Sequence, residues 1–405
     1  MKKNNKNILD YMIRTIILLS ITDIVGGIKI FSYFNKIILI IFVSEFIVYS
    51  FRNKYNMKDV FFFYLTIVLT GVALIYTGSF RYDNFNLVFY LPVWMMLFIV
   101  FAQNKNEIFK VMERNVYYLQ GVVTCWTIII GISIFLPSSY TKDSVFISLS
   151  GGKFGIEPST LLIVAIVFFL YGYKKEKKLL FYLIMPLYCV FMGASRTYLG
   201  VLLILILLFL FIIITDKKKA IFYIACFIGI SLLIISYTNI GRKINDLTYA
   251  KDSYFDFWGT VTSGRTIFWK WDIDAFMQLP IYKRFIGNGY NFPYDVTYNN
   301  GFKRGIWAHN DFLNIIMNYG YIGLVTYLYP FCKFIKVYKK EYSINNIYVC
   351  IFCIAIFINS FFNMSYTYIC ATVSYPIYMV SMCYFLKEYG NERYIKTKWN
   401  SIGRI

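Results

Sequence analysis

The chain has 405 residues, of which 59% are hydrophobic and 21% aromatic. Soluble domains contain about 45 to 50% apolar residues, so this composition argues against a soluble protein and predicts an all-α, polytopic integral membrane protein. The formal net charge of +20 comes from Lys and Arg in short packets between apolar runs. A nucleic-acid-binding protein would gather these residues on one domain, so we expect no nucleic-acid partner.

Twelve apolar runs are long enough to cross a bilayer as helices. The run from Leu179 to Ile214 is too long for one span, because a helix rises about 1.5 Å per residue and a hydrocarbon core is about 30 Å thick. It predicts a hairpin with its tip at Gly-Ala-Ser-Arg-Thr, residues 193–197. The predicted spans are 8–30, 33–51, 59–78, 85–102, 116–137, 157–173, 179–195, 197–215, 219–238, 311–332, 345–363 and 367–386.

The basic residues orient these spans. With a cytoplasmic amino terminus, most of the 41 Lys and Arg residues fall in cytoplasmic connections, as the positive-inside rule requires. Both termini are then cytoplasmic, and residues 239–310 form one large extracytoplasmic loop between spans 9 and 10. We expect a single transmembrane domain, 1–405. No small-residue cleavage site follows the first apolar run, which is therefore interpreted as a span and not as a signal peptide.

A short helix is predicted inside the loop, after Thr262-Ser263-Gly264. Arg265 lies in its first turn, with Trp269 and Asp272 on the flank of the apolar face. A cation in a first turn opposes the helix dipole, so local stability does not explain Arg265. A substrate phosphate, an acidic neighbour and a lipid phosphate are the alternatives. The predicted apolar face consists of Phe268, Trp271, Ala275 and Leu279.

His309 is the only histidine and directly precedes Asn310-Asp311, which can cap the next helix. The positive end of that helix disfavours imidazolium, and a neutral imidazole is suited to accept a proton from a hydroxyl. A capping or packing role is the alternative. Arg196, at the hairpin tip, either snorkels to the interface or joins Arg265 in holding a phosphate through its guanidinium.

These arguments define the candidate site. Trp269 could stack on a sugar, although Trp also gathers at membrane interfaces, and the cations of the loop could contact phosphate. The candidate catalytic residues are His309, Arg196 and Arg265. The candidate substrate-binding residues are Arg284, Lys283, Arg304, Trp269 and Asn310.

No metal and no cofactor are expected. Cys350 and Cys353 form a C-x-x-C pair inside an apolar run without a second pair. Asp272 and Asp274 form a D-x-D, but residues two apart do not face each other on a helix, so both are interpreted as solvated or paired with Arg. Glu45 lies within a span, where a carboxylate is often functional, although pairing with a nearby Lys or Tyr also explains it.

Four motifs resemble the O-antigen polymerase and O-antigen ligase superfamily. They are G-A-S-R-T at 193–197, S-G-R at 263–265, G-N-G-Y at 287–290 and A-H-N-D-F-L-N-I-I-M-N-Y-G-Y-I-G at 308–323. The last is the most specific, because it is similar to the H-N-x-x-L-x-x-x-x-x-x-G-x-x-G signature of that superfamily. The motifs cover roughly 157–340.

The resemblance implies a GT-C-like, metal-independent glycosyltransferase in the cytoplasmic membrane of a bacterium, with its active site on the outer face. Its donor would be an undecaprenyl-diphosphate-linked oligosaccharide. Arg196 and Arg265 would hold the diphosphate, and His309 would activate or position the acceptor hydroxyl. We favour a polymerase of capsule, exopolysaccharide or O-antigen repeat units. The alternatives are an O-antigen ligase and a lipid-linked oligosaccharide flippase, and further expected partners are membrane lipids, a chain-length regulator and a flippase.

Overall fold

The computed structural model describes the chain at residues 2–52, 54–79, 87–141, 145–150, 153–193, 196–214, 216–238, 265–301, 305–342, 346–367 and 369–402. Within these ranges the secondary structure is helical, apart from one isolated β-bridge between Tyr140 and Phe146. The chain is therefore an all-α protein, as the composition predicts.

The helices follow the predicted apolar runs. In the first half they are α1 (Lys2–Ile24), α2 (Lys29–Arg52), α3 (Met57–Thr77), α4 (Leu87–Gln103), α5 (Lys105–Arg114), α6 (Val116–Ser133), η1 (Pro137–Ser139) and α7 (Lys153–Lys174). In the second half they are η2 (Lys177–Leu183), α8 (Ile184–Met192), α9 (Arg196–Ile213), α10 (Lys217–Tyr237), α13 (Arg265–Gln278), α14 (Ile281–Ile286), α15 (Phe292–Asn299), α16 (Asp311–Tyr342), α17 (Asn346–Phe362), η3 (Ser365–Thr367) and α18 (Ile369–Ile402).

Five helices of the described residues are long and apolar enough to cross a membrane. The number becomes six if α4 and α5, bent by 83° at their junction, form one broken span. The protein is thus a polytopic membrane protein, while the twelve spans and the GT-C-like arrangement stay predictions. The predicted break within 179–214 is present, because α8 ends at Met192 and α9 begins at Arg196, and the two helices contact each other. Residues 194 and 195 of the predicted tip lie outside the described residues, and the assignment of two spans to this run stays a prediction.

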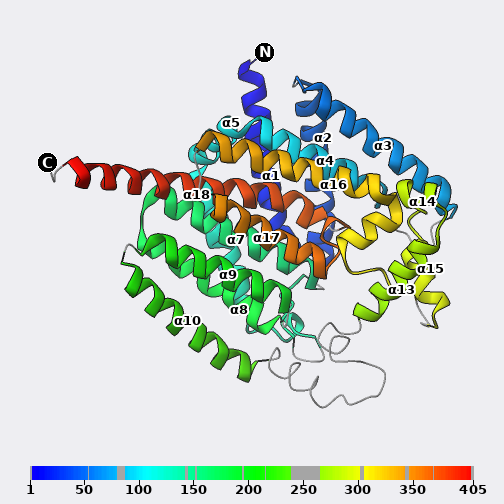
Figure 1. Ribbon diagram of the computed structural model, residues 1–405. Coiled ribbons are helices and arrows are strands. Elements are labelled where there is room, and N and C mark those ends of the chain that lie inside the picture. Colours follow the sequence, from blue (N-terminus) through cyan, green and yellow to red (C-terminus); the bar gives the residue numbers. More distant parts are fainter. Residues whose placement is uncertain are drawn as a thin grey trace.

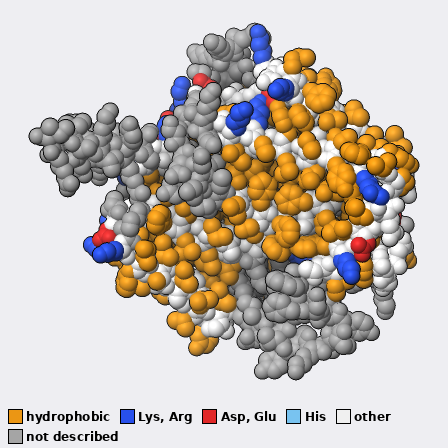
Figure 2. All heavy atoms as spheres, viewed as in Figure 1, with side chains coloured by type: hydrophobic (Ala, Val, Ile, Leu, Met, Phe, Trp, Pro, Cys, Tyr) orange, Lys and Arg blue, Asp and Glu red, His pale blue; other side chains and the backbone are white. Residues whose placement is uncertain are grey.

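The core is built around α7, which packs against α18, α1, α6 and α8 (Figure 1). In the most apolar 18-residue stretch of Ile156–Lys174, 89% of the residues are buried, whereas only 11% are buried in the corresponding stretch of Lys218–Tyr237 in α10. A helix that is apolar all round and buried belongs to the core of a large bundle. On the face shown in Figure 2, the described surface is largely hydrophobic and charged side chains are sparse. Such a surface is suited to contact lipid.

The loop helices α13, α14 and α15 pack at one end of the bundle, beside the first half of α16 (Figure 1). This half of α16 is separated from the second by a kink at Gly320, whose φ is 70°. The kink frees the carbonyl of Met317, which accepts a hydrogen bond from the N–H of Asn288 at 2.9 Å. The turn at 287–289 therefore docks against the kink, and α14 is held to α16.

Gly287 and Gly320 permit this close approach. A Cβ at Gly287 would lie 2.1 Å from the carbonyl oxygen of Asn318, and one at Gly320 would lie 2.3 Å from the backbone of Phe285. Both have positive φ, 90° and 70°, which side chains rarely tolerate. The G-N-G motif is thus a packing device in this fold. The loop limits of 239–310 stay a prediction, since 239–264 lie outside the described residues.

Candidate active site

His309 lies in the short segment between α15 and α16, with α16 beginning two residues later. Its φ is +47°, in the left-handed region. A non-glycine residue there is uncommon and costs about 1–2 kcal/mol. Asn310 is the N-cap of α16, because its Oδ1 accepts a hydrogen bond from the N–H of Leu313 at 3.1 Å. The predicted capping role of Asn310 is confirmed, and its role in substrate binding stays a prediction.

The imidazole of His309 is partly buried. This burial, as the larger cause, and the positive charge of Arg265 together lower the pKa of His309 from 6.5 to about 4. His309 is therefore neutral at physiological pH, in the direction predicted from the sequence. The cause differs from the expected one, since desolvation and the Arg265 charge act where the sequence argument invoked the helix dipole.

Arg265 is the first residue of α13, and its Nη1 donates a hydrogen bond to the carbonyl of Phe362 at the end of α17. Its positive charge acts on His309, and Trp269 of the same helix donates a hydrogen bond to the carbonyl of Ala308, the residue before His309. The structure thus brings a guanidinium, which pairs well with phosphate oxygens, near a neutral imidazole.

Trp269 links α13 to the segment before His309. Its indole N–H donates to the carbonyl of Ala308 at 2.7 Å. Its ring centroid lies 5.1 Å from that of Phe361 and 6.1 Å from that of Phe362, and the side chain is 9% exposed. These contacts hold the site together, and the sugar-stacking role of Trp269 stays a prediction.

Lys283 and Arg284 lie on α14 and make local bonds. The Nζ of Lys283 donates to Asn288 Oδ1 at 2.8 Å and lies 4.9 Å from the ring centroid of Tyr76. The Nε of Arg284 donates to the carbonyl of Leu279 at 2.8 Å. Both contacts stabilise the end of α13 and the turn after α14. Their proposed contact with substrate stays a prediction.

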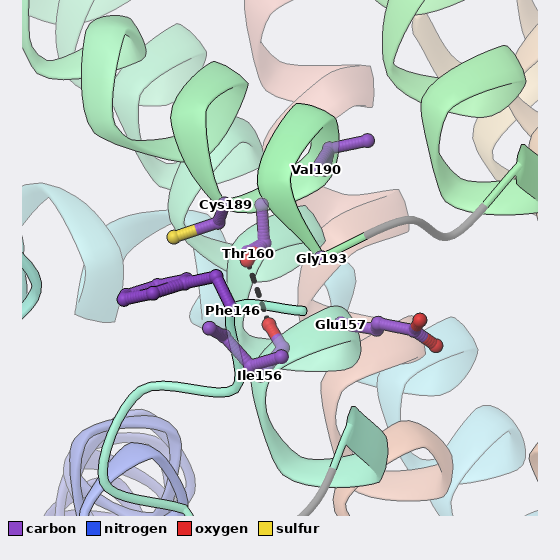
Figure 3. A pocket seen from close by; sticks show the side chains of 7 residues that line it. All are labelled: Phe146, Ile156, Glu157, Thr160, Cys189, Val190 and Gly193. Carbon is purple, nitrogen blue, oxygen red and sulfur yellow. Dashed lines mark hydrogen bonds between the residues drawn. The ribbon is translucent and has the colours of Figure 1, made fainter. Parts of the chain in front are cut away.

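Two predicted residues lie partly or wholly outside the described part of the chain. Arg196 begins α9, but its side chain is outside the described residues, and Arg304 lies in 302–304, also outside them. A small pocket adjoins the turn that leads to α9, and its lining includes Gly193, Cys189 and Glu157 (Figure 3). Glu157 of α7 points away from Cys189 in this view.

The aspartates of the D-x-D differ from the expectation. Asp272 is fully buried, and neither of its carboxylate oxygens has a hydrogen-bond partner among the residues that the structure describes. Burial raises the pKa of Asp272 to about 8. Asp274 is exposed. The interpretation of both as solvated or paired was wrong for Asp272, because α15 and α16 both pack against α13. Among the described residues, no group of three His, Cys, Asp or Glu side chains is arranged to hold a metal ion.

The predicted apolar face of α13 was also incomplete. Its buried residues are Phe268, Trp269, Asp272 and Phe276, whereas Trp271, Ala275 and Leu279 are partly buried against a small cluster with α15 and α16. Helix α13 is covered on two sides, so a single apolar stripe does not describe it. Glu45, in α2, accepts a hydrogen bond from Thr15 Oγ1 at 3.1 Å, so a threonine takes the place of the expected Lys or Tyr.

Sequence reasoning missed a buried polar cluster beneath His309. The carboxylate of Asp311 accepts hydrogen bonds from Tyr327 Oη at 3.1 Å and from the N–H of Tyr366 at 3.3 Å. The hydroxyl of Tyr366 accepts from Asn314 Nδ2 at 2.7 Å. One signal was available, since Asn314 and Asn318 lie in an apolar run, where polar side chains need partners.

The fold and the site define a polytopic membrane protein with a histidine and arginine centre at one end of its helical bundle. Residues 181–328 match the family model described as O-Antigen ligase. The chain thus carries a domain of the O-antigen polymerase and ligase superfamily, which confirms the resemblance drawn from the motifs. No curated protein matches the chain. The matched segment includes Arg265 and His309, and this superfamily acts in polysaccharide assembly at the bacterial inner membrane.

Proposed function

We propose that this protein polymerises oligosaccharide repeat units carried on polyprenyl diphosphate, at the outer face of the cytoplasmic membrane. The observation that carries the proposal is the neutral, partly buried imidazole of His309, which feels the charge of Arg265 and is linked to the same helix through Trp269 and Ala308, inside the segment that matches the O-antigen ligase family. Transfer of a sugar from a diphosphate leaving group to a hydroxyl is assisted by a proton acceptor for the hydroxyl and by a cation that binds the departing phosphate.

The reaction balances with the residues present. The acceptor hydroxyl attacks the anomeric carbon of the donor, a new C–O bond forms, and the hydroxyl proton passes to an imidazole nitrogen of His309. The bond between the anomeric carbon and the diphosphate oxygen breaks, and its electron pair leaves with polyprenyl diphosphate. Arg265, with Arg196, stabilises the charge that builds on this leaving group. His309 then returns the proton to solvent, and neither a metal nor a nucleotide sugar takes part.

The test is glycan chain length in cells that lack the native protein. Wild type should restore long chains, whereas His309→Asn and Arg265→Gln should stop at one lipid-linked repeat unit. Asn tolerates the left-handed backbone of position 309 better than most residues, so His309→Asn removes the base with little backbone strain. Long chains in both variants would overturn the proposal.

An O-antigen ligase is the second candidate, because the matched family has that description. The two activities differ in the acceptor. With purified protein, elongation of a lipid-linked repeat unit supports polymerase, and transfer only to a lipid A core supports ligase. If single repeats never reach the outer face in cells, the flippase alternative replaces both.

A further inference from the structure

The last two residues of α17 and the segment after them, residues 361–367 and here called the α17–α18 turn, contact the helices that carry the candidate catalytic residues. On the α13 side, the carbonyl of Phe362 accepts the hydrogen bond from Arg265, and the rings of Phe361 and Phe362 pack on Trp269. Trp269 in turn bonds to the carbonyl of Ala308, the residue before His309. The turn thus reaches both Arg265 and the backbone of the histidine segment.

On the α16 side, Tyr366 binds the first two turns of the helix at three points. Its N–H donates to Asp311, and its hydroxyl accepts from Asn314 at 2.7 Å and from Asn318 at 3.4 Å. Ser360 adds a hydrogen bond to Asp311 and lies 3.1 Å from Tyr327 Oη. All these side chains are fully buried, so water does not compete for the bonds.

On the α9 side, the connection runs through α18. Tyr375 donates its hydroxyl hydrogen bond to Ser365 Oγ at 3.1 Å, and it is also hydrogen-bonded to Tyr198. Tyr198 is the third residue of α9, which begins at Arg196. One short turn is therefore bonded to α13 and α16 directly and to α9 through one tyrosine.

We propose that the α17–α18 turn is the positioning element of the active site, with Tyr366 as its central positioning residue. Only the expected effect on polymerisation kinetics rests on the proposed function. The turn lies outside the matched segment 181–328 and outside every sequence motif. It acts by fixing the start of α16, and with it His309, relative to Arg265. A displacement of about 1 Å in such a site costs on the order of 100-fold in rate.

The experiment compares Tyr366→Phe with Tyr338→Phe in the full-length protein in nanodiscs. Tyr338 is also a fully buried residue of this bundle, and its hydroxyl donates to the carbonyl of Phe101 at 3.3 Å, away from the site. Two readouts are taken: polymerisation kinetics with a lipid-linked repeat unit, and the NMR titration of the single histidine. Ser360→Ala, which removes one donor to Asp311, is a milder variant should Tyr366→Phe fold poorly.

Tyr366→Phe and Ser360→Ala should lower kcat about 10- to 100-fold, with KM for the donor changed less than about twofold. Both should raise the pKa of His309, because a looser α16 start admits water to the imidazole. Tyr338→Phe should change neither quantity. If the Tyr366 and Ser360 variants behave like Tyr338→Phe in both readouts, the inference is wrong. If the histidine pKa moves but wild type does not polymerise, positioning holds and the proposed function fails.

Discussion

The charge state of His309 provides the most direct test of the site. Burial and Arg265 lower its pKa from 6.5 to about 4, which at about 1.4 kcal/mol per pH unit is about 3 kcal/mol against the imidazolium ion. Burial is the larger cause. Replacing Arg265 by Gln should therefore raise the pKa, yet leave it below 6.5.

The chain makes the assay simple, because it contains one histidine. Selective isotope labelling of histidine, with purification through a tag that lacks histidine, leaves a single imidazole to follow by NMR from pH 3.5 to 8. The folded protein binds a proton at His309 less readily than the unfolded chain does. The contribution of this histidine to the free energy of unfolding is therefore complete above pH 6.5 and is lost as the pH falls toward 4. The helical circular dichroism signal must therefore stay constant over the points that are fitted.

The same titration reports on substrate. A nitrogen with a pKa of about 4 is a weak base at neutral pH. A diphosphate bound to Arg265 would offset the positive charge near His309, so adding a soluble polyprenyl diphosphate analogue should raise the histidine pKa. A wild-type midpoint at or above 6.5 would refute the buried site. An unchanged midpoint in Arg265→Gln would refute the electrostatic coupling.

Three further predictions concern stability in detergent. The pKa of Asp272 is raised to about 8 in the folded protein, against about 3.9 in the unfolded chain. Its contribution to the free energy of unfolding is therefore complete below pH 3.9 and is lost as the pH rises toward 8. The difference in Tm between Asp272→Asn and wild type should therefore increase in favour of the variant from pH 5 to pH 8. A constant difference across this pH range would contradict the prediction. Gly287→Ala should lower Tm more than Gly301→Ala. Both glycines have φ near 90°, but only at Gly287 would an added Cβ lie within 4 Å of neighbouring backbone atoms. Equal losses of Tm would show that the close approach at Gly287 does not affect stability. Lys333 forms an ion pair with the buried carboxylate of Asp59, which also accepts hydrogen bonds from Gln103 and Tyr329. Lys333→Met should lower the free energy of unfolding by about 3–5 kcal/mol, because it leaves the buried Asp59 charge without its counter-charge. Adding Asp59→Asn should restore most of this loss, and a Lys333→Met variant as stable as wild type would contradict the prediction.

The parts of the fold that were predictable depend on local chemistry. Apolar runs and the Gly-Ala-Ser break at 193–195 fixed the positions of helices and the hairpin, because span length and turn residues act over a few positions. The kink at Gly320 was not predicted. Its cause is the close approach of the 287–289 turn, a contact that no local pattern contains.

The candidate site also has one part that local sequence features predict and one part that they do not. Arg265 stood out because a cation in the first turn opposes the helix dipole. His309 stood out because it is the only histidine and directly precedes the cap of a helix. Tyr366 did not, because its partners Asp311 and Asn314 lie more than 50 positions away in the sequence. Asp272 was misinterpreted for a related reason, since its burial depends on α15 and α16 and not on its own helix.

The backbone of His309 gives a final test that separates function from local stability. Its φ of +47° lies in the left-handed region, which disfavours residues with a Cβ by about 1–2 kcal/mol and leaves glycine unaffected. His309→Gly should therefore be more stable than His309→Ala by about 1 kcal/mol, the reverse of the usual order, with both inactive in chain-length assays. Thermal unfolding of the two variants measures the difference. An Ala variant as stable as the Gly variant would show that position 309 is unstrained, and a histidine kept there could then be explained by packing alone.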